Sequence, residues 1–345
     1  MQDVITGIQQ VGIGVTNADE AKYLYRELFG MRAKIFDDKS PASLMSAYTG
    51  NETHNRHAIL TMNLSCGGGF EIWQFTSRNP SLQPDIQIGD IGTFAVKLRT
   101  SDIHAAHQFY RDNSLVVTSP VQFTITNGQY FWVRDNLGNH FQIVECHEKY
   151  LDNKFVCGGV CGAVIGVSNM EKSIEFYSTV FGINNKVFET VCSEIVFGKK
   201  VLLKKVLIQK DRNPRGAFTN LLGDIQIELV EAIHSNPAKI FENRYWGDCG
   251  FIHLCFDVLD MGLLKSRAEG NGHVFSVDSH GSFRMENAAG RFCYIEDPDG
   301  TLIELVETHK VPILKKINWH FDLKKRKNNG PLPKWMIKML GLNRV

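Results

Sequence analysis

Hydrophobic and polar positions along the chain follow a pattern that occurs twice. Residues 7–31 begin with an apolar, strand-like run, pass an Asn suited to capping a helix, and continue with apolar residues three and four apart up to a Gly. Residues 159–183 have the same order, at an offset of 152 positions (159 against 7). The pattern predicts a strand followed by a capped helix in both places.

Three later stretches with strand-like alternation are also duplicated. The pairs are 70–80 with 227–237, 89–102 with 247–260, and 131–148 with 293–310. A weaker repeat relates residues 7–80 to residues 89–149 within the first half. We therefore predict an α+β protein of four βαβββ modules, because repeats of this length are units of architecture.

The domain boundaries follow from the same repeat. We expect an N-terminal domain at 1–150, a C-terminal domain at 156–310 and a separate basic tail at 311–345. Each of the two domains would contain two consecutive modules. The prediction rests on the order of the modules along the chain.

Composition narrows the class of protein. The 345 residues are 43% hydrophobic and 22% charged, which is typical of a globular protein with a core, and the net charge of +1 gives no general attraction for nucleic acid. We expect a cytoplasmic protein, because the first residues enter a strand pattern directly and no apolar run reaches the roughly 18 residues of a membrane span. The eight cysteines form no CxxC pair and are expected to be reduced thiols.

Three segments resemble the vicinal oxygen chelate superfamily, which includes glyoxalase I, bleomycin resistance proteins and extradiol dioxygenases. They are GVSNMEKSIEFYSTVFG (166–182), HLCFDVLD (253–260) and DPDGTLIELVE (297–307). The resemblance implies that modules pair into two glyoxalase/dioxygenase-like domains with cupped mixed sheets. It also implies one divalent metal ion per working cup, held by the first and last strands of the paired modules.

The resemblance gives four ligand positions for each domain. In the second half they fall on Gly162, Glu228, His253 and Glu304, and in the first half on Gln10, Glu71, Ala95 and Gln142. We expect the metal at Glu228, His253 and Glu304, since two carboxylates and an imidazole suit a divalent ion. A carboxylate among Ile, Leu and Val would be costly to bury without such a partner.

The first half lacks the imidazole, and we expect residues 1–150 to act as a scaffold. Glyoxalase I itself has Gln at the first position, so Gln10 and Glu71 remain alternatives as residual ligands. Taken singly, His253 and each Glu are more often core or solvent-facing residues than ligands. Their joint occurrence in a repeat favours the metal site.

The donor set predicts a metal-dependent, glyoxalase-like lyase or isomerase. The ion would stabilise an enediolate formed from a small molecule with vicinal oxygens, with Glu228 as the first candidate base and Glu304 as the second. Tyr294 is a candidate hydroxyl donor to the substrate, although a packing role is the simpler interpretation. His280, in the polar loop 276–291, is a candidate acid or base, although an exposed loop histidine is the more common case.

Two other functions stay open. An extradiol-type ring-cleaving dioxygenase would need Fe(II) and two histidines, and the first histidine is replaced by Gly162. This favours Mn, Zn, Mg, Ni or Co over iron. A non-catalytic binder of small molecules, like the resistance proteins, would typically lack the Glu228, His253 and Glu304 set.

The tail from 311 to 345 contains nine Lys or Arg and one Asp, and its last stretch places apolar residues at helical spacing. A basic amphipathic helix of this kind can lie on an anionic membrane surface. We favour an extension packed on its own chain or on the mate in a homo-oligomer. In either case we expect the tail to be dispensable for metal binding.

Overall fold

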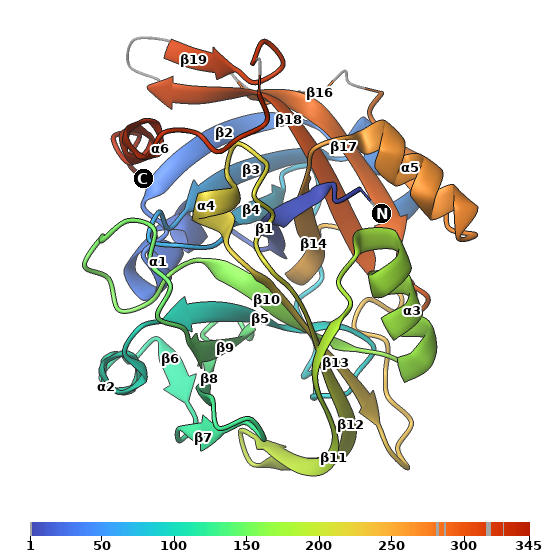
Figure 1. Cartoon of the computed structure of the whole chain (residues 1–345). Helices are drawn as coiled ribbons and strands as arrows, with labels where there is room; N and C mark the ends of the chain where they lie inside the picture. The colour runs from blue at the N-terminus through green and yellow to red at the C-terminus, as the bar shows by residue number, and fades with distance from the viewer. Residues whose placement is uncertain (1, 281–282, 286–287, 315–318, 327) are drawn as a thin grey trace.

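The computed structural model describes residues 2–280, 283–285, 288–314, 319–326 and 328–345 (Figure 1). Its strands form two curled, mixed sheets. Sheet A has ten strands, in the order β15 (Phe275–Asp278), β17 (Ala288–Glu296), β18 (Leu302–Leu314), β14 (Gly250–Val258), β1 (Ile5–Gly14), β4 (Gly69–Phe75), β3 (Asn55–Met62) and β2 (Ala33–Pro41), with β16 (Phe283–Met285) on β17 and β19 (Trp319–Asp322) on β18.

Sheet B has nine strands among the described residues. Their order is β11 (Asn185–Val196), β12 (Lys199–Lys210), β13 (Ile225–Ala232), β10 (Val160–Gly166), β5 (Gly92–Thr100), β9 (His140–Glu145), β8 (Gln129–Asp135) and β6 (Val116–Thr118), with β7 (Gln122–Phe123) on β8. The helices are α1 (Ala18–Phe29), the 3-10 helix η1 (Ser43–Tyr48), α2 (Ile103–Arg111), α3 (Met170–Phe181), α4 (Thr219–Leu222), α5 (Met261–Gly270) and α6 (Lys334–Leu340). The predicted α+β fold with two cupped mixed sheets is confirmed.

The duplicated strand–helix units form as the sequence predicts. Asn17 caps α1 by accepting hydrogen bonds from the backbone N–H groups of Asp19 and Glu20, and Gly30 ends the helix with φ 64°. Asn169 caps α3 by accepting a hydrogen bond from the backbone N–H of Lys172, and Gly182 ends the helix with φ 70°. The left-handed conformation at both ends favours glycine, which explains the Gly at this position of the repeat.

Each sheet combines modules from both halves of the chain. Strand β1 pairs antiparallel with β14, and β10 pairs antiparallel with β5. The first module therefore shares sheet A with the fourth, and the second shares sheet B with the third, as the blue and orange strands of Figure 1 show for sheet A. The assignment of one cup to residues 1–150 and the other to residues 156–310 was wrong. Alternation along a strand determines which residues face the cup, but it does not select the partner among four similar first strands.

Three apolar clusters form the core of the part of the chain that the structure describes. The largest joins one face of both sheets to the helices α1, α2, α3 and α5. A second cluster lies with sheet A and includes α6, and a third, smaller cluster lies with sheet B. Each sheet thus has one face in the common core and one face that forms a cup.

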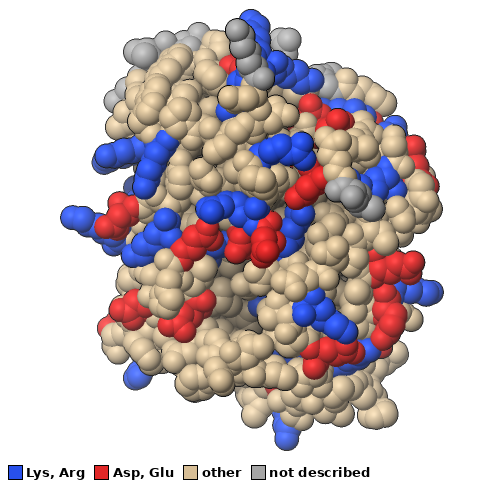
Figure 2. Space-filling model, viewed as in Figure 1, with Lys and Arg blue, Asp and Glu red and all other residues tan. Residues whose placement is uncertain are grey.

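The C-terminal tail packs on its own chain. In α6, Met336, Ile337 and Leu340 are buried in the cluster of sheet A, and the carbonyl of Asn343 accepts a hydrogen bond from the N–H of Lys34. None of the described helices has the length and apolar character needed to cross a membrane. On the face in Figure 2 both signs of charge are interspersed, in line with the net charge of +1.

Candidate metal centre

Four polar side chains meet in the cup of sheet A. They come from four adjacent strands: Glu304 from β18, His253 from β14, Gln10 from β1 and Glu71 from β4. The register places Gly12 of β1 opposite both His253 and Glu71, and Cys255 of β14 opposite Glu304. The first and fourth modules therefore each supply one half of the cluster.

The distances within the cluster are short. The Nε2 atom of His253 lies 3.2 Å from Oε2 of Glu71 and 3.2 Å from Oε2 of Glu304. The Nε2 group of Gln10 donates hydrogen bonds to the same two oxygens, at 3.3 and 3.1 Å. Possible ligand atoms of Glu71, His253 and Glu304 all lie within 4.8 Å of one another. All four side chains are buried.

Two buried atoms of the cluster make no hydrogen bond of good geometry with the described residues. They are Oε1 of Gln10, and Nε2 of His253, whose contacts with the two carboxylates at 3.2 Å are ion pairs. Buried polar atoms in proteins are nearly always paired, so an unpaired one calls for an explanation. A cation between the carboxylates would take the place of the proton on Nε2 of His253 and, after a half-turn of the Gln10 amide, would be contacted by Oε1, so the donor set fits a metal ion.

Tyr294 and Gly12 fix the position of the imidazole. The hydroxyl of Tyr294 lies 3.2 Å from Nδ1 of His253 and donates to Oε1 of Glu304 at 3.2 Å. On the other side, a Cβ at Gly12 would lie 2.4 Å from Cε1 of His253, which is closer than atoms can approach. Orientation of a ligand histidine through its second nitrogen is a common feature of metal sites.

The electrostatics of the cluster follow from burial and two negative charges. Burial opposes the charged imidazolium of His253, but Glu304 and Glu71 outweigh it and raise the pKa of His253 to about 9. Burial alone would raise the pKa of Glu304, whereas the charge of His253 lowers it on balance. Burial, together with the charges of Glu304 and Glu71, raises the pKa of Tyr294 well above its usual value. Tyr294 is therefore a hydroxyl donor at neutral pH.

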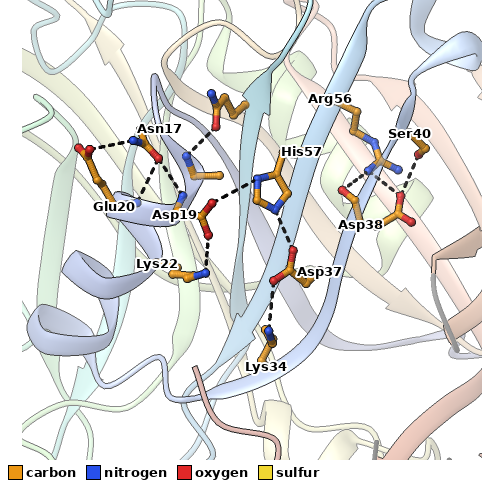
Figure 3. Close-up of polar contacts among 12 residues, drawn as sticks. Asn17, Asp19, Glu20, Lys22, Lys34, Asp37, Asp38, Ser40, Arg56 and His57 are labelled. Carbon is orange, nitrogen blue, oxygen red and sulfur yellow. Dashed lines mark hydrogen bonds and ion pairs between the residues drawn. The ribbon is translucent and has the colours of Figure 1, made fainter.

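Two cavities border the cluster, and Glu71 and Glu304 line both. One, of about 80 Å³, is mostly apolar and is closed by Leu222 of α4 and Leu340 of α6. The other, of about 220 Å³, is lined by residues that include Arg56 and Tyr294. The guanidinium of Arg56 is bound by the carboxylate of Asp38 at 2.9 Å, as Figure 3 shows.

Glu228 does not belong to this cluster, which corrects its assignment as metal ligand and first candidate base. It lies on β13 in sheet B, where its carboxylate binds Lys97 at 2.5 Å and Lys205 at 2.7 Å. Burial would raise the pKa of Glu228, but Lys205 and Lys97 outweigh it and lower the pKa to about 2. The cost of burying this carboxylate is offset by two ammonium groups rather than by a metal ion.

His280 is also not brought to the cluster. It follows β15, its side chain is 80% exposed, and its ion-pair contact is with Asp278 at 3.7 Å. Residues 281–282 and 286–287 of the polar loop lie outside the described residues.

The sequence interpretation gave Gln10 and Glu71 a structural role. However, the ligand positions of the first module combined with those of the fourth module form the complete set of Gln, Glu, His and Glu. This combination was the signal in the sequence that could have identified the site.

Comparison with known proteins agrees with this fold. The Glyoxalase/Bleomycin resistance protein/Dioxygenase superfamily matches residues 161–305. A Bacillus subtilis protein named "putative dioxygenase" has 12% identity and a TM-score of 0.58, over 89% of this chain and 86% of that one. Glyoxalase I from Zea mays has 12% identity and a TM-score of 0.51, over 88% of this chain and 92% of its own. No curated protein matches in sequence. Residues 161–305 thus match the Glyoxalase/Bleomycin resistance protein/Dioxygenase superfamily, and the chain as a whole shares the fold of these two solved structures.

Proposed function

We propose that the protein is a metal-dependent lyase or isomerase of the glyoxalase type, acting on a small molecule with two adjacent oxygen atoms. One observation carries the proposal: Gln10, Glu71, His253 and Glu304 converge in one buried cluster, and Oε1 of Gln10 has no hydrogen-bond partner among the described residues. The same four residue types include the Gln that glyoxalase I has at its first position.

The donor chemistry suits a divalent ion. Glu71 and Glu304 together carry charge −2, and His253 adds a neutral nitrogen donor once its proton is displaced. A half-turn of the Gln10 amide exchanges Oε1 and Nε2, so that this residue offers an oxygen. Oxygen and imidazole ligands favour Mn, Zn, Mg, Ni or Co. When bound, the ion supplies Lewis-acid stabilisation of negative charge on the two substrate oxygens.

Proton transfer, positioning and exclusion of water depend on the residues of the cup. We assign the proton transfer next to the carbonyl to the carboxylates of Glu71 and Glu304, because both line the two cavities in which a substrate would lie. Tyr294 is a positioning residue, since it holds both His253 and Glu304 through its hydroxyl. The site lies in a cup closed on one side by α4 and α6, which limits access of water.

The two cavities limit the size and the polarity of the substrate. The apolar space of about 80 Å³ against Leu222 and Leu340 accepts only a compact apolar group. The larger space of about 220 Å³, with Arg56 on its wall, leaves room for the polar remainder. We therefore propose a small substrate with one compact apolar substituent beside its two oxygens.

Metal analysis of the purified full chain tests the proposal. We expect about one divalent ion per chain in the wild type, loss of the ion in His253→Ala, and weaker binding in Glu71→Gln. Glu228→Gln is the matched control, since this buried carboxylate lies in the other sheet and should leave the metal content unchanged. Absence of metal after reconstitution would refute the proposal. Iron with catechol-dependent oxygen uptake would replace it by an extradiol-type dioxygenase.

A further inference from the structure

The cup of sheet B holds a cavity of about 870 Å³, which is far larger than a packing defect. Strands β6 and β8 of the second module form one wall, and β11 of the third module forms the other. Cavities that bind small molecules are commonly about 300–1,000 Å³ in volume. Figure 1 shows these strands curling around the lower part of the molecule.

The floor of this cup has an ammonium group in place of a metal site. Gly162 stands at the position that Gln10 has in sheet A, and a Cβ there would meet the backbone oxygen of Gln226 at 2.1 Å and Cδ of Lys97 at 2.9 Å. The Lys97 side chain lies beside Gly162, and its ammonium group donates to Oε2 of Glu228 at 2.5 Å and to Oε1 of Gln142. A fixed positive charge at this point repels a divalent ion. The second cup is therefore not a second metal site.

One cation on the wall of the cavity is available to an anion. Glu194 and Glu228 are both bound by Lys205, which leaves one of its three ammonium hydrogens without a partner among the described residues. Arg134 on the wall has no carboxylate within 4.0 Å in the described part of the chain. Among the residues that line the cavity, Arg134 and Lys205 balance Glu194 and Glu228, so the attraction for an anion is local to Arg134 and to Lys205 rather than a net charge of the cavity.

The rim of the cavity is apolar and uncovered. Four of its side chains are half-exposed or more: Val117 (50%), Phe123 (65%), Ile125 (60%) and Ile195 (55%). Exposed apolar groups that gather at one opening, rather than scatter singly, mark binding sites.

One residue of the rim is held in an unfavourable backbone conformation. Phe197, in the turn between β11 and β12, has φ 48°, a value that bulky residues rarely adopt. Its ring lies 5.2 Å from the guanidinium of Arg134 and 5.6 Å from the ring of His140. The turn from the third module thus holds the unpaired cation of the second module at the wall of the cavity.

We propose that the cup of sheet B is a second, metal-free binding site for a small organic anion with an apolar body. Arg134 and the free hydrogen of Lys205 bind the anionic group, and Phe123, Ile125 and Ile195 contact the apolar part. This site is independent of the proposed metal chemistry, because it shares no residue with the cluster in sheet A.

Binding of 8-anilinonaphthalene-1-sulfonate to the full chain, followed by fluorescence, tests this site. We expect saturable binding of one probe per chain, weakened about tenfold in Arg134→Gln through loss of a charge-assisted hydrogen bond, and largely restored in Arg134→Lys. Ile195→Ser should also weaken it. Arg111→Gln and Leu82→Ser alter an exposed cation and an exposed apolar residue elsewhere and should have no effect. 4-Phenylbutyrate should displace the probe, and 4-phenylbutanol should not.

The metal site provides the decisive cross-check. His253→Ala should lose metal and retain probe binding, whereas Arg134→Gln should retain metal and lose probe affinity. Probe binding that is unchanged in both Arg134→Gln and Ile195→Ser overturns the proposal. Probe binding that disappears in His253→Ala places the probe in sheet A and overturns it as well. Circular dichroism of each variant confirms that the fold is retained.

Discussion

Gly12 has no side chain because the imidazole of His253 lies where its Cβ would be, 2.4 Å from Cε1. We predict that Gly12→Ala displaces the ring and weakens divalent-metal binding by about tenfold or more, as small displacements of a ligand do. Titration calorimetry with Zn²⁺ measures the change. Gly262→Ala on α5 is the control, because its nearest neighbour would be 3.4 Å away. Equal affinities for the Gly12 variant and the wild type would contradict the proposed site.

A substitution at Glu228 should lower the stability of the protein without changing its metal content. Glu228→Gln leaves Lys97 and Lys205 buried without their shared carboxylate, and we predict a loss of about 3–5 kcal/mol in the free energy of unfolding. Urea denaturation measures this loss. Unchanged stability would show that the ion pairs contribute nothing.

The same ion pairs predict how the stability of the protein depends on pH. The folded-state pKa of Glu228 is about 2, below its ordinary value of 4.5, so the folded chain holds fewer protons on this group than the unfolded chain between these values. The stabilising contribution is therefore complete above about pH 4.5 and is lost as the pH falls toward 2. We predict that Glu228→Gln lacks this part of the acid transition. Identical unfolding curves against pH for both proteins would refute it.

At the level of elements, local signals were the dependable ones. Asn17, Gly30, Asn169 and Gly182 mark helix ends because capping involves only neighbouring backbone groups, and all four act as predicted. The apolar spacing in the tail predicted α6, because helical periodicity is also a local property of the sequence. What the sequence did not reveal is where α6 packs, since an amphipathic face does not identify the surface that covers it.

The packing of α6 on sheet A gives an element-level prediction. Leu340 is 1% exposed and lines the apolar cavity beside the metal cluster. We expect Leu340→Ala to lower the free energy of unfolding by about 2–5 kcal/mol, because it leaves a cavity in a packed cluster. Metal affinity should be retained, since all four ligands lie on strands of the sheet. Trp335→Ala on the same helix is the control, because this side chain is 55% exposed. Equal stability losses for both variants would contradict the packing.

For the whole molecule, the repeat predicted the ligand positions but not their combination. Glu304 and His253 were correctly placed together because they belong to one module. Glu71 was separated from them, although it lies 3.2 Å from His253, because its contact depends on which modules share a sheet. Pairing among four similar modules is decided by non-local contacts along the first strands, and a single sequence holds no local signal for such contacts.

The same repeat produces two matching contacts that hold the sheets together. The hydroxyl of Tyr25, on the helix of the first module, donates to Asp135 of sheet B at 3.1 Å. The hydroxyl of Tyr177, on the helix of the third module, donates to Asp297 beside sheet A at 3.3 Å. Modules that neighbour each other in sequence but belong to different sheets are thus joined through buried hydrogen bonds.

We predict that Tyr25→Phe and Tyr177→Phe each lower the free energy of unfolding by about 1–3 kcal/mol, because each leaves a buried aspartate with one donor fewer. The two contacts share no partner, so the double variant should show the sum of both losses in urea denaturation. Tyr23→Phe is the control, since that ring is 49% exposed. Metal content should stay constant throughout, because neither contact touches the cluster in sheet A. A large loss for one tyrosine and none for the other would contradict equivalent roles, and the two halves would then be joined unequally despite their common pattern.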